Sequence, residues 1–166
     1  MSESEERVTN DCPATSYPIT VDFPIRFRDI DMMGHVNNAV FITMMEQARV
    51  TYCERLAGSA FSRSMGPRGV SYILAAITCH FKAPVKLGAV VRTRVGITDL
   101  RRSSFTMSYE LADATTGTLV ATGTSVQVVY DYDRARSVPI PAALRSQVAA
   151  LEGWATDDPR RIPPAT

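Results

Sequence analysis

The order of hydrophobic and polar residues along the chain predicts a strand, a long helix and then a series of strands. Alternating β-branched and aromatic residues predict a strand over residues 19–27. Apolar residues between Phe41 and Leu56 recur at helical spacing, which predicts a helix from about Ala39 to Ala57. Such a helix is about 28 Å long, and its wide apolar stripe leads us to expect that other elements largely wrap it.

From residue 71 onward the pattern changes to the period of two that strands show. Val91, Thr93 and Val95, for example, fall on one face of an extended segment. The sequence DATTG, residues 113–117, predicts a turn between two such segments. Four strands are predicted in this part of the chain, over residues 71–85, 89–98, 103–113 and 118–133.

These elements predict an α+β fold in which a five-stranded antiparallel sheet is wrapped around one long central helix. A further C-terminal helix is predicted over residues 139–151, where proline stands at the start and apolar residues follow at helical spacing. A chain of 166 residues fits one domain, which we place at residues 19–152. The polar residues 1–18 and the charged, proline-rich residues 153–166 are predicted to be flexible tails.

The composition disfavours several classes of partner. Because 18 Lys and Arg balance 17 Asp and Glu, the net charge is +1 and no broad basic surface is expected for nucleic acid or an acidic membrane. No window approaches the roughly 18 consecutive apolar residues of a membrane-spanning helix. Cys12, Cys53 and Cys79 form no CxxC pair, which favours a reducing compartment. We therefore expect a cytoplasmic protein with no nucleic-acid or membrane partner.

The polar junction between the first strand and the helix carries the clearest chemistry. Asp31 leaves the strand as a carboxylate near the apolar layer, and Gly34 permits a tight turn. Asn37 and Asn38 are good N-cap residues, and the first helical amides are unsatisfied donors at the positive end of the dipole. Such donors could stabilise a tetrahedral oxyanion while the carboxylate attacks a thioester carbonyl or deprotonates water. The junction therefore favours acyl transfer from a thioester.

A purely structural interpretation of the same residues is open as well. Asp29 and Asp31 could pair with Arg26 and Arg28 at the end of the strand, and the two asparagines could act only as helix caps. Composition and spacing do not decide between these two interpretations.

The sequence RFRDIDMMGHVNNAVFITMMEQAR, residues 26–49, resembles the loop and helix of the hotdog-fold thioesterases, specifically the 4-hydroxybenzoyl-CoA thioesterase-like acyl-CoA thioesterases. The pattern D-x-D-x-x-G-H-V-N-N followed by E-x-A-R carries the resemblance, and the order of elements agrees over about residues 19–133. The resemblance implies a hotdog fold and a hydrolase that splits an acyl-CoA thioester into free acid and CoA. It does not name the acyl group, and a carrier-protein thioester is also compatible with it.

The resemblance also implies roles by position. Asp31 matches the family's catalytic carboxylate, acting as nucleophile or general base. Asn38 matches the residue at the helix start whose backbone N–H polarises the thioester carbonyl. Gly34 and His35 belong to the same catalytic motif, whereas Asp29 is expected to shape the loop.

Coenzyme A carries several phosphate charges, so local basic residues are expected near the site, and arginine forks suit phosphates well. Glu46 is an acid on the central helix that could act near the site or could simply pair with Arg49 at i+3. The expected substrate-binding residues are Asn37, Glu46, Lys82, Arg101 and Arg102.

No cofactor is expected beyond the CoA of the substrate. No metal is expected either, because Cys79 and His80 are adjacent on a predicted strand and therefore face opposite sides of the sheet. The resemblance implies self-association as a dimer, or as a homotetramer formed from two dimers, which would also cover the edges of the sheet.

Two alternatives remain open at this point. Hotdog enoyl-CoA hydratases and dehydratases combine an acid with a histidine, and here Val36 occupies the position expected for that histidine. The chain could also be a non-catalytic module that binds acyl thioesters without turning them over.

Overall fold

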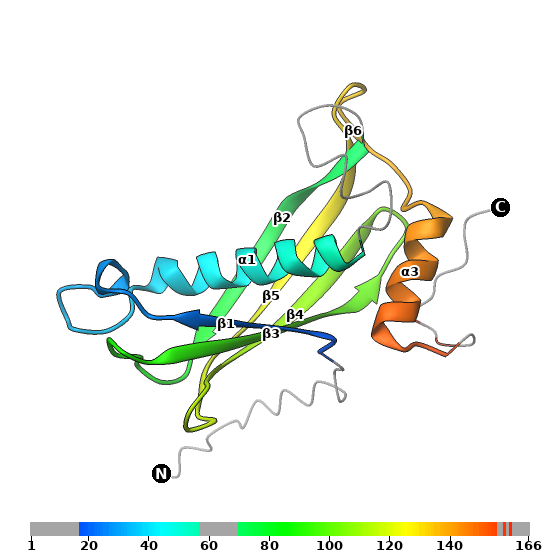
Figure 1. Cartoon of the computed structure of the whole chain (residues 1–166). Coiled ribbons are helices and arrows are strands. Elements are labelled where there is room, and N and C mark those ends of the chain that lie inside the picture. Colours follow the sequence, from blue (N-terminus) through cyan, green and yellow to red (C-terminus); the bar gives the residue numbers. More distant parts are fainter. Residues whose placement is uncertain (1–16, 57–69, 156–157, 159, 161–166) are drawn as a thin grey trace, which may run out of the picture.

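A long helix, α1, lies along one face of a curved antiparallel sheet (Figure 1). The computed structural model describes residues 17–56, 70–155, 158 and 160. The elements are β1 (Ile19–Pro24), η1 (Phe27–Asp29), α1 (Asn38–Arg55), β2 (Val70–Phe81), β3 (Val90–Leu100), β4 (Ser104–Asp113), β5 (Leu119–Asp131), β6 (Arg136–Ser137) and α3 (Ala142–Glu152).

The five long strands form the order β1-β3-β4-β5-β2, and every neighbouring pair is antiparallel. This confirms the predicted five-stranded sheet and adds to it the two-residue strand β6, which pairs with the end of β5 beyond the start of β4. Such a short strand carries too few residues to show a hydrophobic period. Strands β1 and β2 are left as the two edges of the sheet.

The predicted strand faces are those that the structure buries. Val91 and Val95 of β3 and Met107 of β4 are almost fully inaccessible to solvent. On β5, a Cβ added at Gly123 would lie 2.5 Å from the terminal methyl of Met45 on α1. Glycine at this position therefore lets the helix pack closely against the middle of the sheet.

Helix α1 begins at Asn38, and the side chain of Asn37 caps it by accepting a hydrogen bond from the Ala39 amide at 2.9 Å. The predicted end at Ala57 lies outside the described residues. Met45 and Ala48 are buried, whereas Gln47 is exposed. The helix is therefore buried along one side, and the expectation that it is largely wrapped is not met within a single chain.

Strand β1 ends at Pro24, earlier than the predicted end at residue 27. The reason is local: the Arg26 amide donates to Asp29 Oδ2 at 2.9 Å, which curls the chain into the 3-10 turn η1. The Ile25 amide still donates to the Ala89 carbonyl at 3.0 Å, so the chain stays beside the loop that precedes β3.

Helix α3 confirms the predicted C-terminal helix and lies near the other end of α1 (Figure 1). Glu152 of α3 is buried, and its Oε1 accepts hydrogen bonds from the Tyr52 hydroxyl and the Ile97 amide, each at 2.6 Å. Gly153 adopts φ 68° and ends the helix, and Trp154 packs into the hydrophobic core. Among the described residues, no helix has the length and apolar character required to cross a bilayer.

Candidate active site

The loop between β1 and α1 is a tight hairpin, and Asp31 is the first residue of its turn. Ile30 and Val36 form an isolated antiparallel bridge. The Asp31 amide donates to the His35 carbonyl at 2.8 Å, and the Gly34 amide donates to the Asp31 carbonyl at 3.0 Å. Gly34 has φ 79°, a conformation that residues with a Cβ rarely adopt, which explains the glycine at this turn.

The Asp31 carboxylate is held by its own turn. Its Oδ1 accepts hydrogen bonds from the Met33 amide at 2.9 Å and the His35 amide at 3.4 Å. Oδ2 accepts no hydrogen bond from the described residues, and no Lys or Arg among them forms an ion pair with Asp31. One carboxylate oxygen therefore remains available for chemistry.

The start of α1 supplies a backbone donor next to this acid. Asn37 lies in extended conformation and its side chain is engaged with Ala39, so the cap is complete without Asn38. Within the described part of the chain, the Asn38 N–H has no hydrogen-bond acceptor. It lies at the positive end of an 18-residue helix, where the dipole favours negative charge on a ligand.

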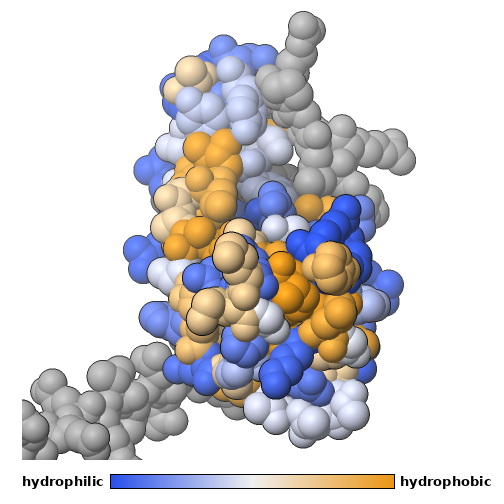
Figure 2. Space-filling view, turned by 90° about the vertical axis from the view of Figure 1, so that its left-hand side faces the viewer, coloured by the Kyte–Doolittle hydropathy of each residue, from blue (hydrophilic) through white to orange (hydrophobic). Residues whose placement is uncertain are grey.

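Asp31 and Asn38 line the same cavity, which has a volume of about 410 Å³. Figure 2 shows the end of the molecule that carries the β1–α1 loop, where hydrophobic and hydrophilic side chains are interspersed over the surface. His35 and Lys82 also line the cavity, so four of the predicted site residues are brought together. The remaining lining residues are Met33, Val36, Phe41, Phe81, Ala83, Pro84 and Val85.

The far wall of the cavity, from Phe81 to Val85, was not predicted as part of the site apart from Lys82. The Val36 amide donates to the Val85 carbonyl at 2.8 Å, which fixes this wall against the loop. Phe81 packs edge-on against Phe41 of α1, with ring centroids 5.3 Å apart. The only sequence signal was an aromatic residue at the end of an apolar run, shortly before Pro84.

Asp29 follows the structural interpretation. Its carboxylate accepts from Arg26 Nε at 3.0 Å and Nη2 at 3.1 Å, and it is buried. The hydrogen bonds from Arg26 lower the pKa of Asp29, so the carboxylate is ionised. The alternative that both acids only form ion pairs therefore holds for Asp29 and does not hold for Asp31.

Glu46 lies outside the cavity. Its side chain is 61% exposed, and its Oε1 lies 3.5 Å from Nη2 of Arg49, as the i+3 interpretation suggested. Arg49 is buried, and its Nε and Nη1 have no hydrogen-bond partner in the described structure. The substrate-binding role of Glu46 remains a prediction.

Arg101 and Arg102 lie at the opposite end of the sheet from Asp31. They follow β3, whose eleven residues extend about 36 Å from the end that contacts the β1–α1 loop. Arg101 forms an ion pair with Asp99 at 2.7 Å, and the carbonyls of both arginines accept hydrogen bonds from Arg145 of α3. One chain therefore does not bring these two arginines to the cavity.

No metal-binding group is found in the described ranges: no three His, Cys, Asp or Glu side chains there are grouped so that they could hold an ion. Cys53 and Cys79 are both free thiols. Burial raises the pKa of Cys53 to about 11, so this thiol is protonated at neutral pH and is a poor nucleophile.

Comparison with known proteins identifies the family. The family model of the thioesterase-like superfamily matches residues 25–148, so the chain belongs to this superfamily. A thioesterase from Thermus thermophilus, solved in complex with coenzyme A and Zn, is 34% identical. That comparison covers 84% of this chain and 97% of the other, with a TM-score of 0.73. The predicted hotdog fold and family are confirmed.

More distant structures share the fold. A 1,4-dihydroxy-2-naphthoyl-CoA thioesterase from Synechocystis is 18% identical, with a TM-score of 0.71 over 79% of this chain and 95% of the other. A thioesterase superfamily protein from Jannaschia sp. CCS1 is 22% identical, with a TM-score of 0.71 over 81% of this chain and 82% of the other. None of the curated proteins matches the chain.

Proposed function

We propose that the protein is an acyl-CoA thioesterase that hydrolyses its substrate at the Asp31–Asn38 cavity. The observation that carries this proposal is that a carboxylate with an uncommitted oxygen and a free helix-start amide line one cavity of about 410 Å³. Apolar side chains from Phe41 and Phe81 line the same cavity and suit an acyl group. Membership of the thioesterase-like superfamily supports the same reaction class.

The proposed reaction consumes one water and releases a carboxylic acid and the CoA thiol. Asp31 acts either as the nucleophile, through an acyl-enzyme anhydride that water then hydrolyses, or as the base that takes the proton of the attacking water. In both versions the carbon–sulfur bond breaks and the sulfur leaves as a thiolate. Since a thiol pKa is roughly 8.5, this leaving group needs little help from a general acid.

The Asn38 amide is proposed to bind the thioester oxygen as it becomes an oxyanion. A fixed N–H donor at a helix N-terminus needs no rearrangement when the negative charge develops, and one such donor typically accelerates a reaction by about 10²–10³. The free Asn38 N–H and the capping of the helix by Asn37 support this role.

Lys82 is proposed to contact the phosphates of CoA, since it is exposed at the cavity wall. Arg101 and Arg102 could contribute only from a second subunit. Antiparallel pairing of two β2 edges would bring the partner's β3–β4 turn to the end of the sheet that carries Asp31. We therefore retain self-association as a dimer, or a dimer of dimers, as part of the proposal.

The proposal is tested by thiol release from a panel of short, long, branched and aromatic acyl-CoAs, with the corresponding carrier-protein thioesters in parallel. We expect stoichiometric release of acid and thiol for at least one acyl class. Binding of acyl-CoA without thiol release from any substrate would point to a non-catalytic module. Hydration of an enoyl-CoA with the thioester intact would point to the hydratase alternative.

A further inference from the structure

Arg26 and Asp29, which stand five and two residues before Asp31, form an ion pair and do not line its cavity. The Asp29 carboxylate accepts three hydrogen bonds from one residue, the Arg26 amide at 2.9 Å, Nε at 3.0 Å and Nη2 at 3.1 Å. The Asp29 side chain is 6% exposed and that of Arg26 is 55% exposed. The pair thus combines a buried carboxylate with a guanidinium that is accessible to solvent.

Asp29 also holds the start of the helix through its main chain. Its carbonyl accepts a hydrogen bond from the Asn37 amide at 2.9 Å. Asn37 is the cap of α1 and directly precedes Asn38, whose N–H is the proposed oxyanion donor. One residue therefore joins the end of β1 to the start of α1 at the base of the hairpin that carries Asp31.

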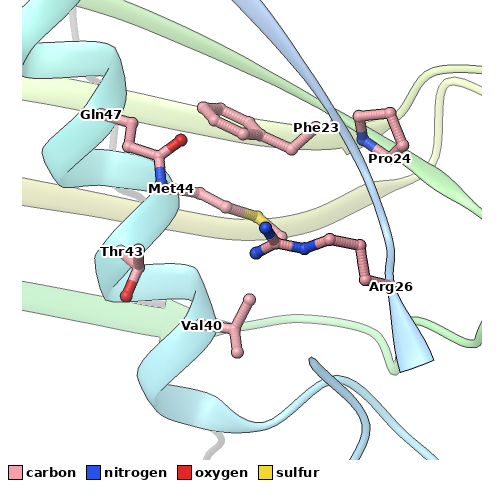
Figure 3. Close-up of a pocket in the computed structure, with 7 residues that line it drawn as sticks. All are labelled: Phe23, Pro24, Arg26, Val40, Thr43, Met44 and Gln47. Carbon is pink, nitrogen blue, oxygen red and sulfur yellow. The ribbon is translucent and has the colours of Figure 1, made fainter. Parts of the chain in front are cut away.

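Arg26 also faces the side of the helix. It lines a second cavity, of about 190 Å³, between β1 and α1. Figure 3 shows its side chain extending from the end of β1 toward Met44 and Gln47 of α1. The guanidinium that holds Asp29 thus also faces the helix whose first turn supplies the backbone donor.

We propose that Arg26 and Asp29 are positioning residues, which fix the separation between the Asp31 carboxylate and the Asn38 N–H. This inference rests on the proposed function, because it concerns the geometry of that same site. The two reacting groups are joined by one hairpin, and the Asp29–Asn37 hydrogen bond closes its base. A displacement of about 1 Å between reacting groups can lower a rate by about a hundredfold.

The test compares Asp29→Asn and Arg26→Gln with a matched control, Asp22→Asn. Asp22 lies on β1, the strand that leads into the loop, and pairs with Arg92 through two hydrogen bonds of 2.8 and 2.7 Å, but it has no link to the loop. We expect kcat to fall about tenfold or more in both test variants with KM nearly unchanged. Arg26→Lys keeps the charge and should restore part of kcat, whereas Asp22→Asn should leave both constants as they are.

A second readout does not depend on turnover. Asp29→Asn should make the Asn37 amide exchange its hydrogen at least about tenfold faster, because its acceptor is no longer held in place. Arg26 is exposed enough that Arg26→Gln should fold even where Asp29→Asn does not. Wild-type kcat in Arg26→Gln, or a rise in KM without a fall in kcat, would overturn the inference.

The two proposals fail in different ways. If the wild-type protein releases no thiol from any substrate, the proposed function has failed, and the exchange rate of the Asn37 amide then decides about the loop. Unchanged exchange in Asp29→Asn would show that the ion pair does not position the helix start.

Discussion

Two carboxylates lie near opposite ends of α1, and the protein holds them in different ways. At the start of the helix, the Asp31 carboxylate accepts hydrogen bonds from two amides of its own turn, those of Met33 and His35. At the other end, Glu152 accepts from Tyr52 of α1 and Ile97 of β3, which lie 100 and 55 residues away in the sequence. A carboxylate held locally can be changed without loosening the fold, whereas one that joins three elements cannot. This difference supports the proposed catalytic role of Asp31 and a stabilising role of Glu152.

The largest expected effect is on the donor beside Asp31. Asn38→Pro removes the N–H at the first helical position, where proline is well tolerated, and Asn37 already has the extended conformation that a residue before proline prefers. We expect kcat to fall by about 10²–10³ with little change in melting temperature.

The matched control for this variant is Asn38→Ala, which keeps the backbone donor. Thiol release and a thermal melt of both variants decide the question. Equal rates in Asn38→Pro and Asn38→Ala would remove the helix-start amide from the mechanism.

Replacing Glu152 should have the opposite effect, lowering stability while leaving kcat unchanged. Glu152→Ala leaves the Tyr52 hydroxyl and the Ile97 amide without their buried acceptor, and each lost partner typically costs about 1–3 kcal/mol. We expect urea unfolding to show a loss of about 3 kcal/mol, with kcat per folded molecule unchanged. A large fall in kcat at unchanged stability would contradict a purely stabilising role for Glu152.

The pH dependence of stability sharpens the same contrast. Burial raises the pKa of Glu152, so the stability this group contributes is present below the unfolded value of about 4.3 and is lost as pH rises through the folded pKa. Glu152→Gln is neutral at every pH and avoids this loss. Its unfolding free energy relative to wild type should therefore rise as the pH rises above about 4.3, the unfolded value. For Asp29, with its lowered pKa, stability is lost as pH falls.

The smallest expected effect concerns CoA binding at the two ends of the sheet. Lys82→Gln removes one exposed cation at the cavity, worth up to about 1 kcal/mol, so KM should rise about two- to fivefold and less at high salt. Arg101→Gln and Arg102→Gln should raise KM only if a second subunit brings these residues to the cavity. An unchanged KM in Lys82→Gln would exclude it from CoA binding.

How much of the fold and of the candidate site the sequence predicted depends on how far apart in the chain the interacting residues lie. Asp31, Gly34 and Asn38 lie within one hairpin and one helix start, so their spacing in the sequence was enough to predict that they lie near one another. The alternation along β3 likewise identified the buried face, because it depends only on the period of a strand.

The remaining features depend on packing between distant segments. The wall formed by Phe81 and Val85 joins the site only because β2 ends beside the β1–α1 loop. The expected contribution of Arg101 and Arg102 depended on which end of the sheet they occupy, and spacing carries no information about that. The role of Glu152 required a bulge in β3 near Ile97, where the ladder with β4 shifts register and a helix from far along the chain can reach the strand.

The most direct test of catalysis by Asp31 is the Asp31→Asn variant. Its turnover of the best wild-type substrate and its affinity for CoA are measured together. The change is nearly isosteric and lies on a turn, so folding and CoA affinity should be retained. We predict that kcat falls by at least about a hundredfold, the usual scale for losing an acid–base group. Equal rates in Asp31→Asn and wild type would contradict a catalytic role for Asp31.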